Sequence, residues 1–167
     1  MTGREDQVSL PDDIHTVASP TEANSVLEFF NSTPIKNDLH WFTHEATIER
    51  VRERDDRRLY YIMDGDTVIA ALMLWCESRV LDSQEAQIRQ VAVDPGYRES
   101  GHGKRLCRHA EQFAEEFGKS EMIADAAKNE PASTFWRAIG YTDGDTWETD
   151  NGREMIRFRK RLTRRST

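Results

Sequence analysis

The segment 98–103 has the sequence RESGHG, which combines charged residues with two closely spaced glycines. This segment comes directly after a strand-like run, 87–93, and directly before a strongly amphipathic helical pattern. A loop at such a junction exposes backbone N–H groups at a helix N-terminus, where the helix dipole adds partial positive charge. Gly101 and Gly103 have no Cβ atom, so a ligand can approach the backbone closely. The arrangement therefore predicts a binding site for a phosphate or pyrophosphate.

Two other glycine-rich phosphate motifs do not fit these residues. The dinucleotide signature G-x-G-x-x-G requires a third glycine where this chain has Leu106. The P-loop requires Lys and then Ser or Thr where His102 and Gly103 stand, so the hydroxyl that binds Mg²⁺ is absent. The pattern that remains is R-x-x-G-x-G after V-A-V-D-P-G-Y.

This remaining pattern resembles the acyl-coenzyme A loop of the GNAT superfamily of N-acyltransferases. A second segment, 129–141 (NEPASTFWRAIGY), is similar to the family's N-x-x-A-x-x-F-Y-x-x-x-G-F motif and follows at the appropriate distance. Together the two motifs cover residues 87–141. The alternative for the first motif is a surface loop whose glycines only make a turn.

The resemblance implies acetyl-CoA as co-substrate, no metal, and specific roles for residues near the two motifs. Main-chain groups of Val91, Ala92 and Val93 would bond the pantetheine amides, although their side chains alone indicate ordinary core. The amide of Asn129 would contact the pantetheine arm, or cap the helix that follows. The pyrophosphate shell would comprise Arg98, Glu99, Ser100, Gly101, His102, Gly103 and Lys104.

The candidate catalytic residues depart from the family pattern. Many relatives have a Tyr acid where this chain has Trp136, whose indole has no transferable proton and would pack against the coenzyme or the core. Tyr141 is the candidate acid that remains, although it occupies a position where relatives bury an aromatic ring.

A general base is also needed, because the attacking amine must be neutral. Some relatives have a Glu where this chain has Gln87, and Glu85 lies two residues earlier, on the same side of the strand if the strand extends that far. Glu85 is therefore the candidate base, with a solvated charge in the loop 81–86 as the alternative. His40, His44 and Glu45 fall in the region that covers the acceptor in relatives.

Composition limits the class of protein. At 167 residues, with 32% charged and 37% hydrophobic residues, the chain suits one globular domain without a membrane span. Cys76 and Cys107 do not form a C-x-x-C pair, which disfavours a disulfide or a metal site and favours the cytoplasm. We expect a flexible tail over 1–12, an N-acetyltransferase domain over 13–162 and a basic tail over 163–167.

The charge is unevenly distributed along the chain. The net charge of −7 combines seven basic residues and one acidic residue from Asn151 onward, a balance of +6, with −13 over residues 1–150. We expect the basic residues on a solvated edge strand and tail. The acidic body disfavours nucleic acid as a partner, since it would repel phosphate.

Patterning predicts an α/β (α+β) fold in the order β-α-α-β-β-β-α-β-α-β-β. A capping box at Ser19 begins the first helix, 31–38 is loop-like, and Thr43 caps the second helix. Two hairpins turn at 64–67 and 150–152. In the helix after Gly103, the expected inward face comprises Leu106, Ala110, Phe113, Ala114 and Phe117, with Glu111 in solvent. The resemblance implies that strands 87–93 and 122–126 splay apart and that the coenzyme enters there.

Three functional hypotheses follow. The first is an N-acetyltransferase in which an amine of a small molecule or protein attacks the thioester directly. The second is a non-catalytic acyl-CoA-binding or regulatory module, motivated by Trp136 and Gln87. The third is nucleotide or nucleic-acid binding. Asp38, Glu45 and Glu77 favour a cationic acceptor amine, and dimers among relatives leave a homodimer open.

Overall fold

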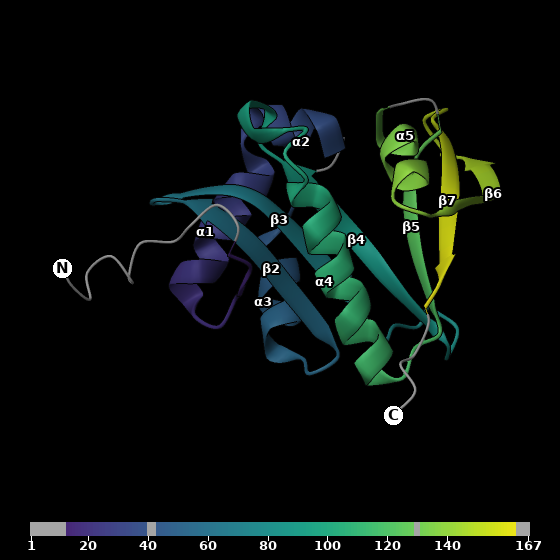
Figure 1. The fold of residues 1–167 in the computed structure, drawn as a ribbon, viewed down its shortest axis with the longest axis horizontal. Helices are drawn as coiled ribbons and strands as arrows, with labels where there is room; N and C mark the ends of the chain where they lie inside the picture. Colours follow the sequence, from purple (N-terminus) through teal and green to yellow (C-terminus); the bar gives the residue numbers. More distant parts are fainter. Residues whose placement is uncertain (1–12, 40–42, 129–130, 163–167) are drawn as a thin grey trace. The chain divides into compact units, whose positions relative to one another are not determined.

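The computed structural model describes residues 13–39, 43–128 and 131–162, which are coloured in Figure 1. The expected tails, 1–12 and 163–167, as well as His40 and Asn129, lie outside the described residues. The elements follow one another as β1 (His15–Thr16), α1 (Pro20–Asn31), α2 (Thr33–Leu39), α3 (Glu45–Glu53), β2 (Arg57–Asp64), β3 (Thr67–Trp75), β4 (Glu85–Val93), the 3-10 helix η2 (Pro95–Tyr97), α4 (His102–Phe117), β5 (Glu121–Ala127), α5 (Pro131–Ala138), β6 (Thr142–Glu148) and β7 (Glu154–Arg161).

The strands are hydrogen-bonded in the order β1-β2-β3-β4-β5-β7-β6. Strand β4 is parallel to β5, whereas β1–β2, β5–β7 and β6–β7 are antiparallel, so the sheet is mixed. This confirms the predicted α/β fold class, with one more helix than expected.

The chain divides into two compact units. The first runs to Leu74 and resumes over 90–108, so it contains β1 to β3, α1 to α3, the end of β4 and the start of α4. The second comprises 75–89 and the chain from His109 onward, and contains β5 to β7, α5 and the other parts of β4 and α4. Each unit has its own fully buried side chains, such as Phe30 and Leu72 in the first and Met122 and Phe158 in the second.

The N-terminal helices show where local sequence signals succeed and fail. The capping box is present, because Glu22 N–H donates to Ser19 Oγ (3.1 Å) and Ser19 N–H donates to Glu22 Oε1 (3.0 Å). The prediction of a loop over 31–38 is wrong, since α2 occupies most of it, with Pro34 in its first turn, where proline is tolerated.

Thr43 does not cap α3, contrary to the prediction. The N-cap position is His44, which makes no side-chain cap bond. Thr43 is fully buried instead, and its backbone N–H and C=O pair with the Asn31 amide at 2.8 Å each. Its hydroxyl oxygen accepts a hydrogen bond from Gln90 Nε2 (3.0 Å). Thr43 therefore ties α1 to β4 through contacts that no local pattern encodes.

Helix α4 is present as predicted, but its buried stripe is rotated. Leu106, Ala110 and Ala114 are fully buried, as expected. Phe117 is 38% exposed and Glu111 is only 5% exposed, which reverses both predictions. The rings of Phe113 and Phe117 contact each other, with centroids 5.9 Å apart, and Glu111 is held in the interior by Tyr141 and Lys160.

The basic strand β7 is not an edge strand, contrary to the prediction. It lies between β5 and β6, and Figure 1 shows it between these two neighbours. The edge strand next to β7 is β6 (TDGDTWE), which is acidic and largely exposed. Basic side chains of β7 are instead drawn to acidic partners on other elements, as described below.

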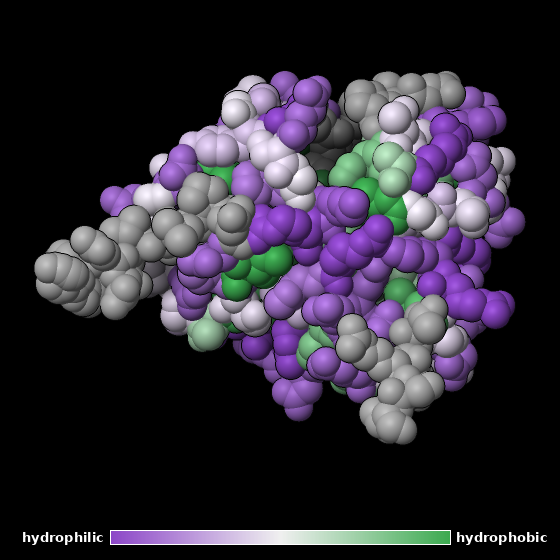
Figure 2. All heavy atoms as spheres, in the orientation of Figure 1, coloured by the Kyte–Doolittle hydropathy of each residue, from purple (hydrophilic) through white to green (hydrophobic). Residues whose placement is uncertain are grey.

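The described surface carries few large apolar side chains. Val80, Phe117 and Trp147 are the exposed large hydrophobic residues among the described ones. Figure 2 shows that, on the face in view, hydrophobic residues reach the surface in small separate patches among hydrophilic ones. Across the described ranges, none of the helices is long and apolar enough to cross a bilayer.

Candidate active site

Strand β4 ends in a turn that its own side chains hold. Asp94 N–H donates to Ile69 C=O (2.7 Å), and the Asp94 carboxylate accepts a hydrogen bond from Gly96 N–H (2.8 Å). Pro95 follows and cannot donate to a sheet ladder. The chain therefore leaves the strand at a defined point and turns through η2 toward α4.

Further side chains brace the loop from within. Arg98 Nε donates to Val93 C=O (3.1 Å), and Ser100 Oγ donates to Tyr97 C=O (2.8 Å). The Tyr97 hydroxyl donates to Asp64, and this hydrogen bond raises the pKa of Tyr97 above its ordinary value. These polar contacts help to fix the path of the backbone between β4 and α4.

The backbone conformation of the loop is unusual at two residues. Glu99 has φ +68° and Gly101 has φ +84°, both in the left-handed region. Arg105 N–H makes the first helical hydrogen bond, to Gly101 C=O (3.0 Å), so the four preceding N–H groups lie at the open end of α4. Left-handed residues beside a helix N-terminus form an anion-binding concavity.

The exposure of the loop residues separates backbone roles from side-chain roles. The side chains of Arg98, Glu99, Ser100 and Lys104 are exposed, and Gly101 is exposed as well. His102 is only 6% exposed; its Nδ1 lies 3.3 Å from Arg105, and its ring lies 6.4 Å from that of Tyr97. His102 and the buried Gly103 can therefore offer a ligand their backbone rather than a side chain.

The strand residues predicted to bond the pantetheine come after the part of β4 that pairs with β5. Strand β4 pairs with β5 from Glu85↔Glu121 to Ile88↔Ala124, and Val91, Ala92 and Val93 come after these pairs. These three residues are half-buried, whereas the first four residues of β4 are buried. Their partial exposure is compatible with a main-chain role for a bound ligand.

Trp136 and Tyr141 contact each other in the second unit. Their rings meet edge to face with centroids 4.9 Å apart, and the residues are 5% and 2% exposed. The Tyr141 hydroxyl donates to Glu111 Oε2 (2.7 Å), and Lys160 Nζ donates to Glu111 Oε1 (3.0 Å). Tyr141 therefore belongs to a buried polar cluster that holds α4, β7 and the segment after α5 together.

Glu85 is on β4, so the strand extends as far as the prediction required. Its carboxylate accepts hydrogen bonds from Arg159 NH1 (2.8 Å) and from Asp82 N–H (3.1 Å). Burial alone would raise the pKa of Glu85, but these hydrogen bonds and the charges of Arg159 and Arg157 lower it overall. A carboxylate with a lowered pKa is a weaker base, and this geometry favours a structural role.

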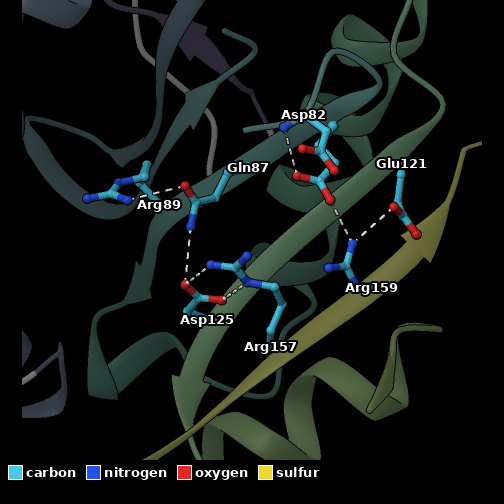
Figure 3. A network of polar contacts seen from close by, with 8 residues as sticks. Asp82, Gln87, Arg89, Glu121, Asp125, Arg157 and Arg159 are labelled. Carbon is cyan, nitrogen blue, oxygen red and sulfur yellow. Dashed lines mark hydrogen bonds and ion pairs between the residues drawn. The ribbon is translucent and has the colours of Figure 1, made fainter. Parts of the chain in front are cut away.

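Glu85 is part of a larger polar face in the second unit, which Figure 3 shows. Arg159 also reaches Glu121 (3.1 Å). Arg157 makes a bidentate pair with Asp125 (2.8 and 2.9 Å), and Gln87 Nε2 lies 3.5 Å from the same carboxylate. We call this set the polar face, and it comprises Glu85, Gln87, Arg89, Glu121, Asp125, Arg157 and Arg159.

Sequence reasoning identified Glu85 and Gln87 in this face but missed their partners. The available signal was the alternation of polar and apolar residues along 85–89, which places the polar ones on one side of the sheet. His44 and Glu45 are exposed at the start of α3. Within the described ranges, no group of three His, Cys, Asp or Glu residues is arranged to hold a metal ion.

Solved structures of similar fold include several acetyltransferases. The ribosomal-protein-S18-alanine N-acetyltransferase from Escherichia coli matches with 16% identity and a TM-score of 0.69, over 92% of this chain and 96% of that one. Ard1 from Thermoplasma volcanium matches with 17% identity and a TM-score of 0.71, over 90% and 97%. An aminoglycoside 6'-N-acetyltransferase, solved with coenzyme A, matches with 13% identity and a TM-score of 0.73, over 93% and 99%. At these identities the likeness shows the fold.

The sequence itself decides the family. No curated protein matches the chain significantly. The model of the acetyltransferase (GNAT) family matches residues 23–141, which include β4, the loop at 98–104 and α5. The chain therefore belongs to the GNAT acetyltransferase family and is an acetyl-CoA-dependent acyltransferase.

Proposed function

We propose that this protein transfers the acetyl group of acetyl-CoA to a primary amine of a small molecule or a protein. The observation that carries the proposal is the backbone of the loop after β4, where Glu99 and Gly101 have positive φ directly before α4. Such a backbone directs N–H groups and the positive end of a helix dipole at one anion. The diphosphate of coenzyme A fits this site.

The loop would hold the diphosphate mainly through its main chain. The N–H groups from Glu99 to Lys104 are the proposed donors, and the exposed side chains of Arg98 and Lys104 would add positive charge. His102 is too buried to offer its ring, so its backbone would take part. The main chain of Val91, Ala92 and Val93 would bond the pantetheine amides, and Asn129 is proposed for the pantetheine arm from the motif alone.

Trp136 has a different role in this proposal. It is nearly buried and packs against Phe135 and Tyr141, with ring centroids 5.0 and 4.9 Å away. An indole in that position anchors α5 and leaves little surface for a coenzyme. We therefore assign Trp136 to packing, the second of the two roles that the sequence left open.

The chemical step is direct attack of the neutral amine on the thioester carbonyl. The C–N bond forms, the C–S bond breaks, and coenzyme A leaves as a thiolate that takes up a proton. The amine nitrogen loses one proton in exchange. Most of the rate gain would come from holding the two reactants together, and main-chain N–H groups near Val93 would stabilise the oxyanion.

The surroundings of Glu85 and Tyr141 bear on which group carries the protons of the reaction. Glu85 is paired with Arg159, and the hydroxyl proton of Tyr141 is directed at Glu111. Both arrangements favour structural roles, so we propose that water carries the protons. Replacing Glu85 with Gln tests this directly: a kcat that falls while the affinity for acetyl-CoA stays constant would restore Glu85 as the base.

Calorimetry with acetyl-CoA tests the proposed site. Gly101→Ala places a Cβ on a residue with φ +84°, next to the proposed diphosphate, and we expect at least a tenfold loss of affinity. Gly152→Ala is the matched control, because Gly152 has φ +87° and equally open space but lies in the β6–β7 turn. An unchanged affinity in folded Gly101→Ala, or an equal loss in both variants, would contradict the placement.

Turnover is measured separately. Wild-type protein incubated with acetyl-CoA and a panel of primary amines should release a free thiol in an amine-dependent manner. Tight binding of acetyl-CoA with no thiol release from any amine would contradict the proposed transfer and leave only coenzyme binding.

A further inference from the structure

The three arginines of the polar face differ in their partners. Arg157 pairs with Asp125, and Arg159 pairs with Glu85 and Glu121. Arg89 hydrogen-bonds to the neutral side chain of Gln87, from NH1 to Oε1 at 3.2 Å (Figure 3). Among the described residues, Arg89 is thus the one arginine of this face without a carboxylate ligand of its own.

The guanidinium of Arg89 is nevertheless held in place. Its Cζ atom lies 4.2 Å from the centroid of the Trp75 ring, in a cation–π contact. The side-chain amide oxygen of Gln87, on the same strand, accepts a hydrogen bond from one of the guanidinium N–H groups. Two supports of this kind orient the planar group and reduce the conformational entropy that a ligand would have to remove.

The charge of Arg89 is incompletely compensated. Burial and the positive charge of Arg157 lower the pKa of the Arg89 guanidinium, despite the nearby negative charge of Asp125. The residue as a whole still keeps exposed surface, so an anion can reach its side chain from solvent. A fixed, accessible guanidinium whose charge is not neutralised is suited to bind a carboxylate through two parallel hydrogen bonds.

The position of Arg89 in β4 connects it to the proposed reaction. It precedes Val91 by two residues, a rise of about 7 Å, and alternation along the strand places Arg89 and Val91 on the same side. We propose that Arg89 binds a carboxylate of the acceptor, so that the acceptor is an amine that also carries a carboxylate group. This inference rests on the proposed acetyl transfer and on the proposed placement of acetyl-CoA along β4.

The kinetic test compares amines that differ only in their anion. One set of substrates consists of ω-amino acids of increasing length and their carboxamides. A second set consists of the dipeptides Ala-Glu and Ala-Gln. Comparison of the two sets distinguishes a free amino acid from an acidic peptide as the acceptor. We expect the wild type to prefer the carboxylates. Arg89→Gln should raise KM for the carboxylates about 10- to 100-fold with little effect on the amides.

Two further variants serve as controls for the role of Arg89. Arg89→Lys keeps the charge but loses the planar fork, and should give an intermediate KM. Arg79→Gln removes an exposed arginine of the same unit from the loop before β4, and should leave the preference unchanged. The proposal is overturned if Arg89→Gln affects carboxylates and amides alike, or if Arg79→Gln has the same effect.

A binding measurement that needs no turnover separates this inference from the proposed function. The indole N–H resonance of Trp75, assigned with Trp75→Phe, is followed by NMR during titration with glutarate or with glutaramide. Glutarate should shift the resonance in the wild type and in Arg89→Lys, but not in Arg89→Gln, and glutaramide should not shift it. If no amine is acetylated but glutarate still shifts the Trp75 resonance in an Arg89-dependent manner, the proposed transfer is contradicted and the anion site is supported. If glutarate causes no shift, the anion site is contradicted.

Discussion

The loop after β4 and the polar face of β4, β5 and β7 handle charge in opposite ways. In the loop, we propose that backbone N–H groups bind the ligand, while the side chains of Arg98 and Ser100 hydrogen-bond to main-chain carbonyl groups of the turn. In the polar face, side chains pair with one another and leave the backbone to the sheet ladders. The loop is composed of adjacent residues, whereas Glu85 and Arg159 are 74 positions apart.

This difference predicts how each region responds to substitution. Apart from the charged Arg98 and Lys104, side-chain changes in the loop should matter little unless they alter the backbone, because the main chain is the proposed source of the donors. A change in the polar face removes one half of an ion pair and leaves the other half partly buried. Stability measurements on single variants can therefore contradict or sharpen the contrast.

The largest effect is expected for Arg159→Met. This change leaves the Glu85 side chain, which is 9% exposed, without its guanidinium partner. Because Arg159 itself is 31% exposed, we expect a loss of about 2–3 kcal/mol in the free energy of unfolding, measured with urea. Arg137→Met is the control, since its ion pair with Asp143 is 50% exposed on both sides and should contribute little to stability. Equal losses would contradict the contrast.

The same variant predicts a dependence on pH. The pKa of Glu85 is lowered in the folded protein, so its contribution to stability is present above the ordinary carboxylate pKa of about 4.3 and is lost as the pH falls through the folded value. The stability difference between the wild type and Arg159→Met should therefore shrink below about pH 4. Urea unfolding at a series of pH values measures it, and a constant difference would exclude Glu85 as the cause.

Tyr141→Phe should have an intermediate effect. It removes the buried hydrogen bond to the Glu111 carboxylate and should cost about 2 kcal/mol of stability. We expect kcat and its pH profile to be retained, because the hydroxyl proton is directed at Glu111. A pH-dependent loss of kcat with unchanged KM would instead identify Tyr141 as the acid.

The smallest effect is expected for Glu99→Gly in the loop. Glycine removes the strain of a non-glycine residue at φ +68°, which is offset in part by the greater flexibility of glycine in the unfolded chain. Stability should change by under about 1 kcal/mol, and the affinity for acetyl-CoA should stay the same. A large loss of affinity would show that the carboxylate, and not the backbone, is what the loop needs at this position.

The candidate site was predictable to the extent that it is local. The capping box at Ser19, the end of β4 at Pro95 and the glycine-rich start of α4 all depend on residues a few positions apart, so their types and spacing were sufficient. The predictions for Thr43, Glu111 and Phe117 were wrong, because their environments are set by Asn31 and Gln90, by Lys160 and Tyr141, and by Phe113. Except for Phe113, which lies one helical turn from Phe117, these partners are distant in the sequence and do not follow from a local period.

By itself, the sequence determined the family, the loop that follows the central strand and the order of most elements. It did so because backbone conformation and helix starts depend on neighbouring residues. The tertiary structure alone decided which charges neutralise one another. Strand β7 lies between β5 and β6, so its arginines meet Asp125, Glu85 and Glu121, and Arg89 is left with Gln87 and Trp75. Charges pair when they lie within a few ångströms of each other in space. The distance between two residues along the sequence does not tell whether they meet in this way.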